Sequence, residues 1–121
     1  MTQNYNEENK ERAFLISLDC GEYDAESSMA ELEELAKTSG AEIIGEMIQK
    51  RPALEAATYM GKGALEEICN FCSNHNIDLI IADGELSPVQ IRNIEDLTGV
   101  RVIDRTTLIL DIFAGRARSS E

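Results

Sequence analysis

Acidic residues stand where a parallel α/β sheet would gather reactive groups, just after stretches that look like strands. These residues are Asp19, Asp83, Glu85 and Asp104. Carboxylates at the carboxyl ends of parallel strands could bind a divalent metal ion or support phosphoryl transfer. The alternative is structural, because Asp and Glu are common in strand-to-helix turns, where they complement helix N-termini. We favour the structural interpretation, since no second acid follows Asp19 directly.

Gly61, Lys62 and Gly63 precede a predicted helix and form a candidate nucleotide-binding turn. Backbone amides at the helix N-terminus, together with the Lys62 ammonium, could bind a phosphate group. A Walker A sequence, GxxxxGK[ST], occurs nowhere in the chain. Tight turns also need glycine for conformational reasons alone. We favour the turn interpretation, with nucleotide contact as the runner-up.

The sequence gives little support to nucleophilic catalysis or to a metal site. Ser87 fits a helix cap better than a nucleophile. Cys69 and Cys72 form a CxxC, but with Leu65 and Ile68 they follow the i, i+3, i+4, i+7 spacing of a helix core stripe. A second pair of metal ligands is absent from the sequence. We therefore predict core packing for both cysteines, no metal site, and no enzyme activity for this chain by itself.

Positive charge is the other candidate for function. Arg105, Arg116 and Arg118 could contact RNA or a neighbouring domain, although each could equally pair with a nearby aspartate. The formal net charge is −12, and residues 1–91 carry all of it. A body this acidic repels phosphate backbones, which argues against non-specific nucleic-acid binding by this chain alone. Any contact with RNA is expected to be local.

Length and composition indicate one ordinary globular domain. The chain has 121 residues, of which 43% are hydrophobic and 28% charged, enough to bury a core. No apolar run approaches the roughly 20 residues of a membrane span. The first ten residues lack the basic start and apolar stretch of a secretory signal. We expect a cytoplasmic protein in which residues 1–11 form a polar, disordered tail.

Hydrophobic patterns predict four strands alternating with four helices over residues 12–113. Strands are expected at 12–18, 41–49, 77–82 and 100–103, and helices at 28–40, 64–74, 87–99 and from 106 onward. The loop 50–58 has room for a helical turn. This βαβαβαβα order implies an α/β fold, with a four-stranded parallel sheet between two layers of helices.

Three of the helices have recognisable start signals. An S-x-x-Q capping box begins at Ser87, with proline at the first helical position. An S-x-x-E box begins at Ser28, and Thr106 can cap the last helix. That last helix is expected to continue to the final residue. Residues 114–121 are therefore predicted to begin a linker.

Several motifs follow one another in an order that no generic α/β domain requires. They are residues 59–63 (YMGKG), Asp83 with residues 85–88 (ELSP), residues 90–93 (QIRN), residues 102–106 (VIDRT), residues 108–113 (LILDIF) and residues 116–118 (RAR). Over about nine-tenths of its length the chain thereby resembles the N-terminal domain of HflX-type ribosome-associated GTPases. The resemblance marks a set of signature and candidate interaction residues: Asp83, Glu85, Ser87, Arg92, Asp104, Arg105, Arg116 and Arg118. One position departs from it, because Ala64 stands where family members usually have lysine, which argues against a phosphate role for the glycine turn.

The resemblance implies a division of labour within a longer protein. A helical linker and a GTPase domain would follow, and GTP and Mg²⁺ would bind there, with no cofactor in this domain. The whole protein would associate with the large ribosomal subunit and its RNA and help to split or rescue stalled ribosomes. This domain would bind the ribosome and have a regulatory role, and it would contact its own linker and G domain. ATP binding has been attributed to this region of the family, which is how the turn at residues 61–63 could matter.

Two other functions stay open on the residues alone. One is a nucleotide-binding or Mg-dependent α/β domain that uses the carboxyl edge of its sheet. The other is a scaffold whose surface only docks the linker and G domain.

Overall fold

Four parallel strands and four helices alternate in the computed structural model, which describes residues 10–115. The strands are β1 (Arg12–Asp19), β2 (Glu42–Lys50), β3 (Leu79–Ala82) and β4 (Arg101–Asp104). The helices are α2 (Ala25–Thr38), α3 (Lys62–His75), α4 (Pro88–Thr98) and α5 (Arg105–Phe113). The α/β class and the predicted order of elements are confirmed.

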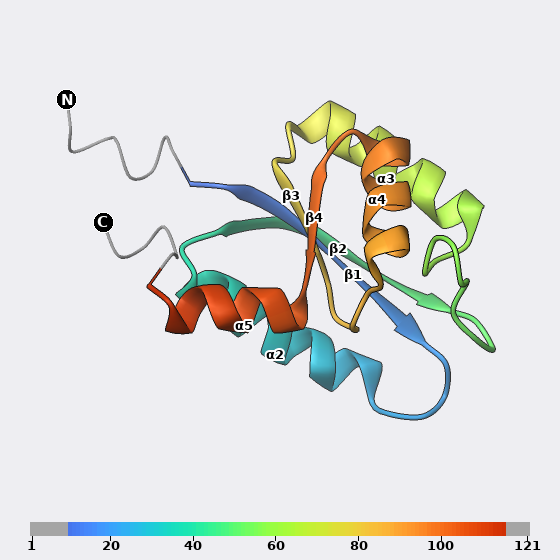
Figure 1. Cartoon of the computed structure of the whole chain (residues 1–121), viewed down its shortest axis with the longest axis horizontal. Helices are drawn as coiled ribbons and strands as arrows, with labels where there is room; N and C mark the ends of the chain where they lie inside the picture. The colour runs from blue at the N-terminus through green and yellow to red at the C-terminus, as the bar shows by residue number, and fades with distance from the viewer. Residues whose placement is uncertain (1–9, 116–121) are drawn as a thin grey trace.

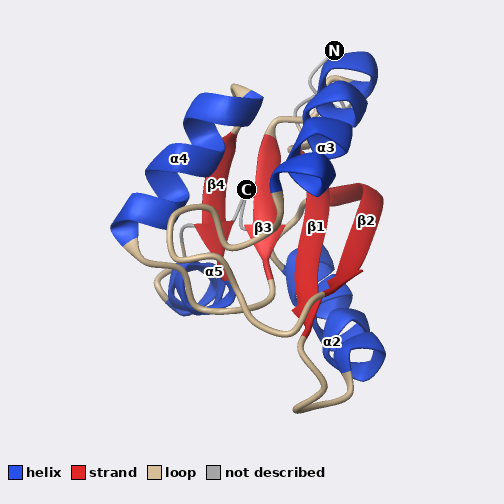
Figure 2. Cartoon of the chain, turned by 90° about the vertical axis from the view of Figure 1, so that its right-hand side faces the viewer, coloured by secondary structure: helices blue, strands red, loops and turns tan. Residues whose placement is uncertain are grey.

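The sheet has the strand order β2-β1-β3-β4, and every neighbouring pair is parallel. The chain leaves β1 for β2 at one edge, then crosses to β3 on the other side of β1 and continues to β4. Helices α3 and α4 cover one face of the sheet, and α2 and α5 cover the other (Figures 1 and 2). The predicted three-layer arrangement is therefore confirmed.

Each face of the sheet has its own core, because successive side chains of a strand point to opposite faces. On β1, Phe14 and Ile16 pack under α3 and α4, whereas Ala13 and Leu15 pack under α2. The cysteine helix α3 contributes buried Cys72 to the first core, as its spacing predicted, whereas Cys69 is half-buried and lies outside that core.

Two helix starts differ in how well the sequence predicted them. Helix α4 has the predicted capping box, in which Ser87 Oγ accepts from the Gln90 amide at 3.1 Å and Gln90 Oε1 accepts from the Ser87 amide at 2.9 Å. The predicted box at Ser28 is wrong. Helix α2 begins earlier, because the Asp24 carboxylate already accepts from the Ser27 amide at 3.2 Å.

Helix α5 also differs from its prediction at both ends. Its N-cap is Asp104, whose carboxylate accepts from the Thr107 amide at 3.0 Å, and Thr106 is an exposed residue inside the helix. The helix ends at Phe113, and Gly115 has a φ of +74°, a left-handed conformation that glycine adopts readily. The expectation of a helix that continues to the last residue overlooked this glycine and is wrong.

Some predictions fall on residues that the structure does not describe. These include Arg116, Arg118, most of the predicted linker and most of the predicted tail. Within the tail, the described Glu11 accepts a hydrogen bond from the Glu42 amide through its carbonyl oxygen at 2.8 Å. No helix in residues 10–115 is long and apolar enough to cross a membrane.

Candidate functional site at the carboxyl edge of the sheet

The strand order reverses between β1 and β3, which is where open α/β sheets usually bind ligands at their carboxyl ends. In this domain a tyrosine fills that place. Tyr59 is buried, with 3% of its surface exposed, and lies beside the ends of β1 and β3. A Cβ atom at Gly84 would lie 3.2 Å from the Tyr59 hydroxyl, so glycine lets the β3–α4 loop pass close to the ring. Burial raises the pKa of Tyr59 well above its usual value, so the hydroxyl remains protonated.

The loop that carries Tyr59 is tightly organised, and residues 56–58 after Pro52 form a single hydrogen-bonded turn. Tyr59 and Glu55 exchange two backbone hydrogen bonds, of 2.8 and 3.0 Å, and Tyr59 has a φ of +67°. Left-handed backbone is unfavourable for an aromatic residue and persists only where its surroundings hold it. Two side chains of α4 do so, because Gln90 donates to the Glu55 carbonyl at 2.9 Å and Asn93 donates to the Ala57 carbonyl at 3.0 Å.

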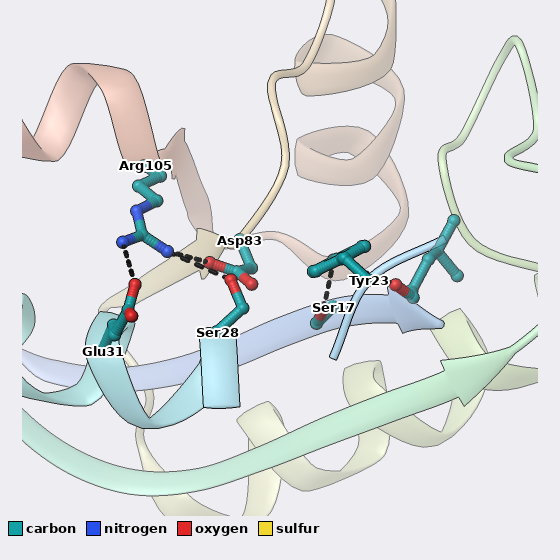
Figure 3. Close-up of polar contacts among 7 residues, drawn as sticks. Ser17, Tyr23, Ser28, Glu31, Asp83 and Arg105 are labelled. Atoms are coloured by element: carbon teal, nitrogen blue, oxygen red, sulfur yellow. Dashed lines mark hydrogen bonds and ion pairs between the residues drawn. The ribbon is translucent and has the colours of Figure 1, made fainter. Parts of the chain in front are cut away.

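Asp83, the first residue after β3, is held in a polar bridge between the two helices of one face (Figure 3). Arg105 Nη1 donates to Asp83 Oδ1 at 3.0 Å and to Ser28 Oγ at 3.1 Å, and Arg105 Nη2 donates to Glu31 Oε1 at 2.9 Å. The Asp83 side chain is fully buried, and its second oxygen has no hydrogen-bond partner among the described residues. The bonds to Glu31 and Asp83 raise the pKa of Arg105, so its charge is permanent.

The other acids of this edge do not converge on a common point. Asp104 caps α5, and its second oxygen accepts from the Leu86 amide at 2.9 Å. Asp19 accepts from the Gly21 amide at 3.0 Å, and Glu85 is exposed. No group of three or more possible metal ligands occurs within residues 10–115. The edge therefore uses its carboxylates to cap helices and join loops, as the structural interpretation predicted.

The glycine turn at the start of α3 is separate from this edge cluster. Gly61 is the N-cap of α3, and its amide donates to Gln49 Oε1 at 3.0 Å. A Cβ atom at Gly61 would clash with Arg51 Nη1, so the glycine makes room for the guanidinium group. Lys62 and Gly63 are exposed, and the first turn of α3 contains no acidic residue. A pocket of about 400 Å³ next to this turn lies between α3 and α4, lined by Lys62, Leu65, Glu66, Cys69, Asn70 and Leu97.

Residues 26–114 match the family described as GTP-binding GTPase N-terminal. The chain belongs to this family. The resemblance to HflX N-terminal domains is thereby confirmed.

Relatives and solved structures agree with this membership. The chain is 51% identical over 112 residues to the GTPase HflX of Caldanaerobacter subterraneus, covering 93% of this chain and 26% of that protein. It is 40% identical over 93 residues to the GTPase HflX of Escherichia coli, covering 77% of this chain and 22% of that protein. The chain thus spans about a quarter of the length of these relatives.

A crystal structure of an SsGBP variant has the same fold, with a TM-score of 0.65 and 24% identity over 86% of this chain and 32% of that one. The crystal structure of SsGBP in complex with GDP gives a TM-score of 0.63 at 24% identity over 88% of this chain and 30% of that one.

The motifs that pointed to the GTP-binding GTPase N-terminal family have mainly structural roles here. Tyr59 of YMGKG is buried at the carboxyl edge of the sheet. Gln90 and Asn93 of QIRN donate hydrogen bonds to the loop that precedes it. Ser87 is a cap, and Asp83, Asp104 and Arg105 join loops and helices. Arg92 and Glu85 differ from these residues, because both are exposed and neither side chain has a hydrogen bond or ion pair with any residue in 10–115.

Sequence reasoning missed the residues that complete these contacts. The sequence predicts Ser28 and Glu31 as a capping box, and it marks Tyr59 only as the first residue of the YMGKG motif. The i, i+3 spacing of Ser28 and Glu31 indicates a shared helix face, but not that Arg105, 77 and 74 residues away, bonds to both. No sequence signal identifies Tyr59, since tyrosine is not a residue that favours positive φ.

Proposed function

We propose that this domain is the ribosome-binding and regulatory N-terminal part of a cytoplasmic GTP-binding protein. The full-length protein would bind GTP with Mg²⁺ in a later domain and hydrolyse it there. It would associate with the large ribosomal subunit and help to split or rescue stalled ribosomes. The match of residues 26–114 to a GTPase N-terminal family carries this proposal, because the matched relatives are GTPases of which this chain covers about a quarter.

The structure of the carboxyl edge supports the proposal that GTP hydrolysis takes place in a later domain and not in this one. Tyr59 fills the position where a ligand would enter, and the neighbouring carboxylates are engaged by Arg105 and by backbone amides. Catalytic groups need a space for the reacting atom and a geometry that converges on it. This domain therefore acts by binding and by coupling to other parts of the protein.

Among the candidate interaction residues, Arg92 is the best placed to contact ribosomal RNA. It is exposed on α4 and has no partner of its own among the described residues. The apolar side chains of Leu54 and Val89 are also exposed, each to 52%. Arginine favours phosphate and base contacts through its planar fork of donors. A single local contact of this kind is compatible with a net charge of −12, whereas a broad RNA-binding surface is not.

Co-sedimentation of the full-length protein with purified large subunits tests the proposal. We expect association, and we expect Arg92→Glu to weaken it by about tenfold or more because a phosphate contact becomes a repulsion. Lys37→Glu is the matched control, because it makes the same charge change on α2, on the other face of the sheet. No association of the full-length protein, or an equal loss in both variants, would contradict the assignment. The isolated chain is expected to show no GTP hydrolysis.

We propose a nucleotide contact at the start of α3 as the second candidate function. The N-cap Gly61 offers no side-chain cap, and the two cations Arg51 and Lys62 flank it without any acid in the first turn. Backbone amides and cations at a helix N-terminus favour the phosphates of a nucleotide such as ATP. The ion pair between Arg51 and Glu55 works against this function, because it already neutralises one of the cations.

Titration calorimetry with ATP and Mg²⁺ separates the two candidates. If the turn binds nucleotide, Lys62→Ala should reduce the affinity, whereas Lys37→Ala should leave it unchanged. Equal heats for the unaltered chain and for Lys62→Ala would remove the turn from consideration. An effect of Asp83→Ala instead would move the site to the carboxyl edge.

A further inference from the structure

The outer face of α5 bears the two most exposed large apolar side chains among the described residues. Phe113 is 83% exposed and Leu110 is 60% exposed. With Thr106 they follow the i, i+4, i+7 spacing of one helix face, so the two side chains lie together. A contiguous apolar patch of this kind marks an interaction surface more often than an isolated exposed residue does.

The inner face of α5 packs against the core of the domain. Leu108 is buried at 2% exposure, and Ile112 packs against the same core cluster beneath α2. Arg105 fixes the beginning of the helix through its bonds to Asp83, Ser28 and Glu31. Helix α5 therefore has two apolar faces, of which the domain covers one.

We propose that the face formed by Leu110 and Phe113 is the docking surface for the polypeptide that follows this domain in the full-length protein. This inference rests on the proposed function, because it takes the domain to belong to a longer GTPase. The family match ends at residue 114, directly after Phe113, while the chain covers about a quarter of the matched relatives. The segment that follows therefore begins beside the patch.

Covalent connection favours this occupant over a second copy of the chain. A connected segment meets the patch at a millimolar effective concentration, without any loss of translational freedom on docking. The surface itself defines what the segment should look like. Glu31 of α2 lies beside α5 but is already paired with Arg105, so the apolar stripe of an amphipathic helix is the feature that complements Leu110 and Phe113.

Hydrogen–deuterium exchange of residues 105–113 tests the docking, measured in the 121-residue chain and in the full-length protein. We expect exchange in the full-length protein to be slower by about tenfold to hundredfold, the effect of covering one large aromatic side chain. The double variant Leu110→Ser, Phe113→Ser should abolish that difference. Val89→Ser is the matched control, because it removes an exposed apolar side chain from α4 on the opposite face.

Two results would overturn the proposal. One is equal exchange of α5 in the two proteins. The other is a dimer of the 121-residue chain in sedimentation that Phe113→Ser converts to monomer, which would make a second copy the occupant. The double variant and Phe113→Ser replace only side chains that are at least 60% exposed, so circular dichroism should report an unchanged fold for both. Slow exchange of α5 in a full-length protein that does not co-sediment with large subunits would retain the docking and reject the ribosomal function.

Discussion

The two faces of the sheet differ in how completely the domain covers its own apolar surface. Helix α4 is capped at both ends, with a box at Ser87 and a left-handed Gly99, and it buries Ile94 completely. Helix α5 is also capped, but its buried Leu108 is matched by an outer Phe113 that faces solvent. The α3/α4 face thus leaves apolar side chains about half exposed, Val89 at 52% and Leu97 at 47%, whereas the α2/α5 face exposes Phe113 to 83% and presents a surface suited to another partner.

The largest predicted effect tests this contrast by truncating one apolar side chain on each helix. Ile94→Ala should lower the free energy of unfolding by about 3 kcal/mol, because it removes a fully buried side chain and leaves a cavity. Phe113→Ala should change it by less than about 0.5 kcal/mol, as expected for an exposed side chain. Urea denaturation of the isolated chain measures both. A cost at Phe113 similar to that at Ile94 would mean that the chain already covers the outer face of α5.

The polar bridge on the α2/α5 face should be the next most sensitive feature. Arg105→Met keeps the aliphatic stem but leaves the fully buried Asp83 carboxylate without its counter-charge. We expect a loss of about 2 kcal/mol, below the usual cost of breaking a buried pair because 26% of the Arg105 side chain is exposed.

Thermal and urea unfolding of two further variants separate charge burial from general damage. Asp83→Asn in the Arg105→Met background should recover part of the loss, because it removes the isolated charge. Arg101→Met is the surface control, since its pair with Glu11 is more exposed and should contribute less than about 1 kcal/mol. Equal losses for Arg101→Met and Arg105→Met would show that the bridge has no special role in holding α5.

The sequence predicted the fold well where the signals are local and overlap. Helix α4 has a cap, a first-turn proline, a capping box and a terminal glycine within residues 87–99, and all of them act as expected. The helices α2 and α5 were predicted with the wrong caps, because Asp24 and Asp104 precede the apolar stripe that defined the predicted helices. In both cases an earlier aspartate already bonds the first free amides.

The candidate site was harder to predict, since its contacts join distant parts of the chain. Spacing alone indicated that acids would gather at the carboxyl edge, but not that Arg105 would engage Asp83. The positive φ of Tyr59 depends on hydrogen bonds that Gln90 and Asn93, more than thirty residues away, donate to the loop before it. Such contacts depend on tertiary packing, which overrides the preference of the single residue.

The two residues predicted as helix caps, Ser87 of α4 and Thr106 of α5, give a smaller test of the comparison between these helices. Ser87→Ala should destabilise the chain by about 1 kcal/mol, because the Gln90 amide loses its acceptor. Thr106→Ala should change stability by no more than a few tenths, about 0.3 kcal/mol, since Thr106 is an exposed helical residue. Thermal unfolding of the two variants in parallel measures the difference. A larger effect at Thr106 would restore it as the cap of α5 in place of Asp104.

The last test concerns the far edge of the α2/α5 face, and its effect appears only as the pH changes. The Glu46 carboxyl of β2 lies against Glu33 of α2, and partial burial, followed by the hydrogen bond and charge of Glu33, raises the pKa of Glu46 to about 7. Because this pKa exceeds the value of 4.5 expected for the unfolded chain, the folded state binds more protons between those two pH values. Stability contributed by protonated Glu46 is therefore present at pH 4.5 and lost as the pH rises through 7. Glu46→Gln should remove this loss, so the variant should have a higher Tm than the unaltered chain at pH 8 and nearly the same Tm at pH 5. Glu42→Gln on the same strand is the control, and an equal gain there at pH 8 would assign the effect to net charge rather than to the Glu33–Glu46 contact.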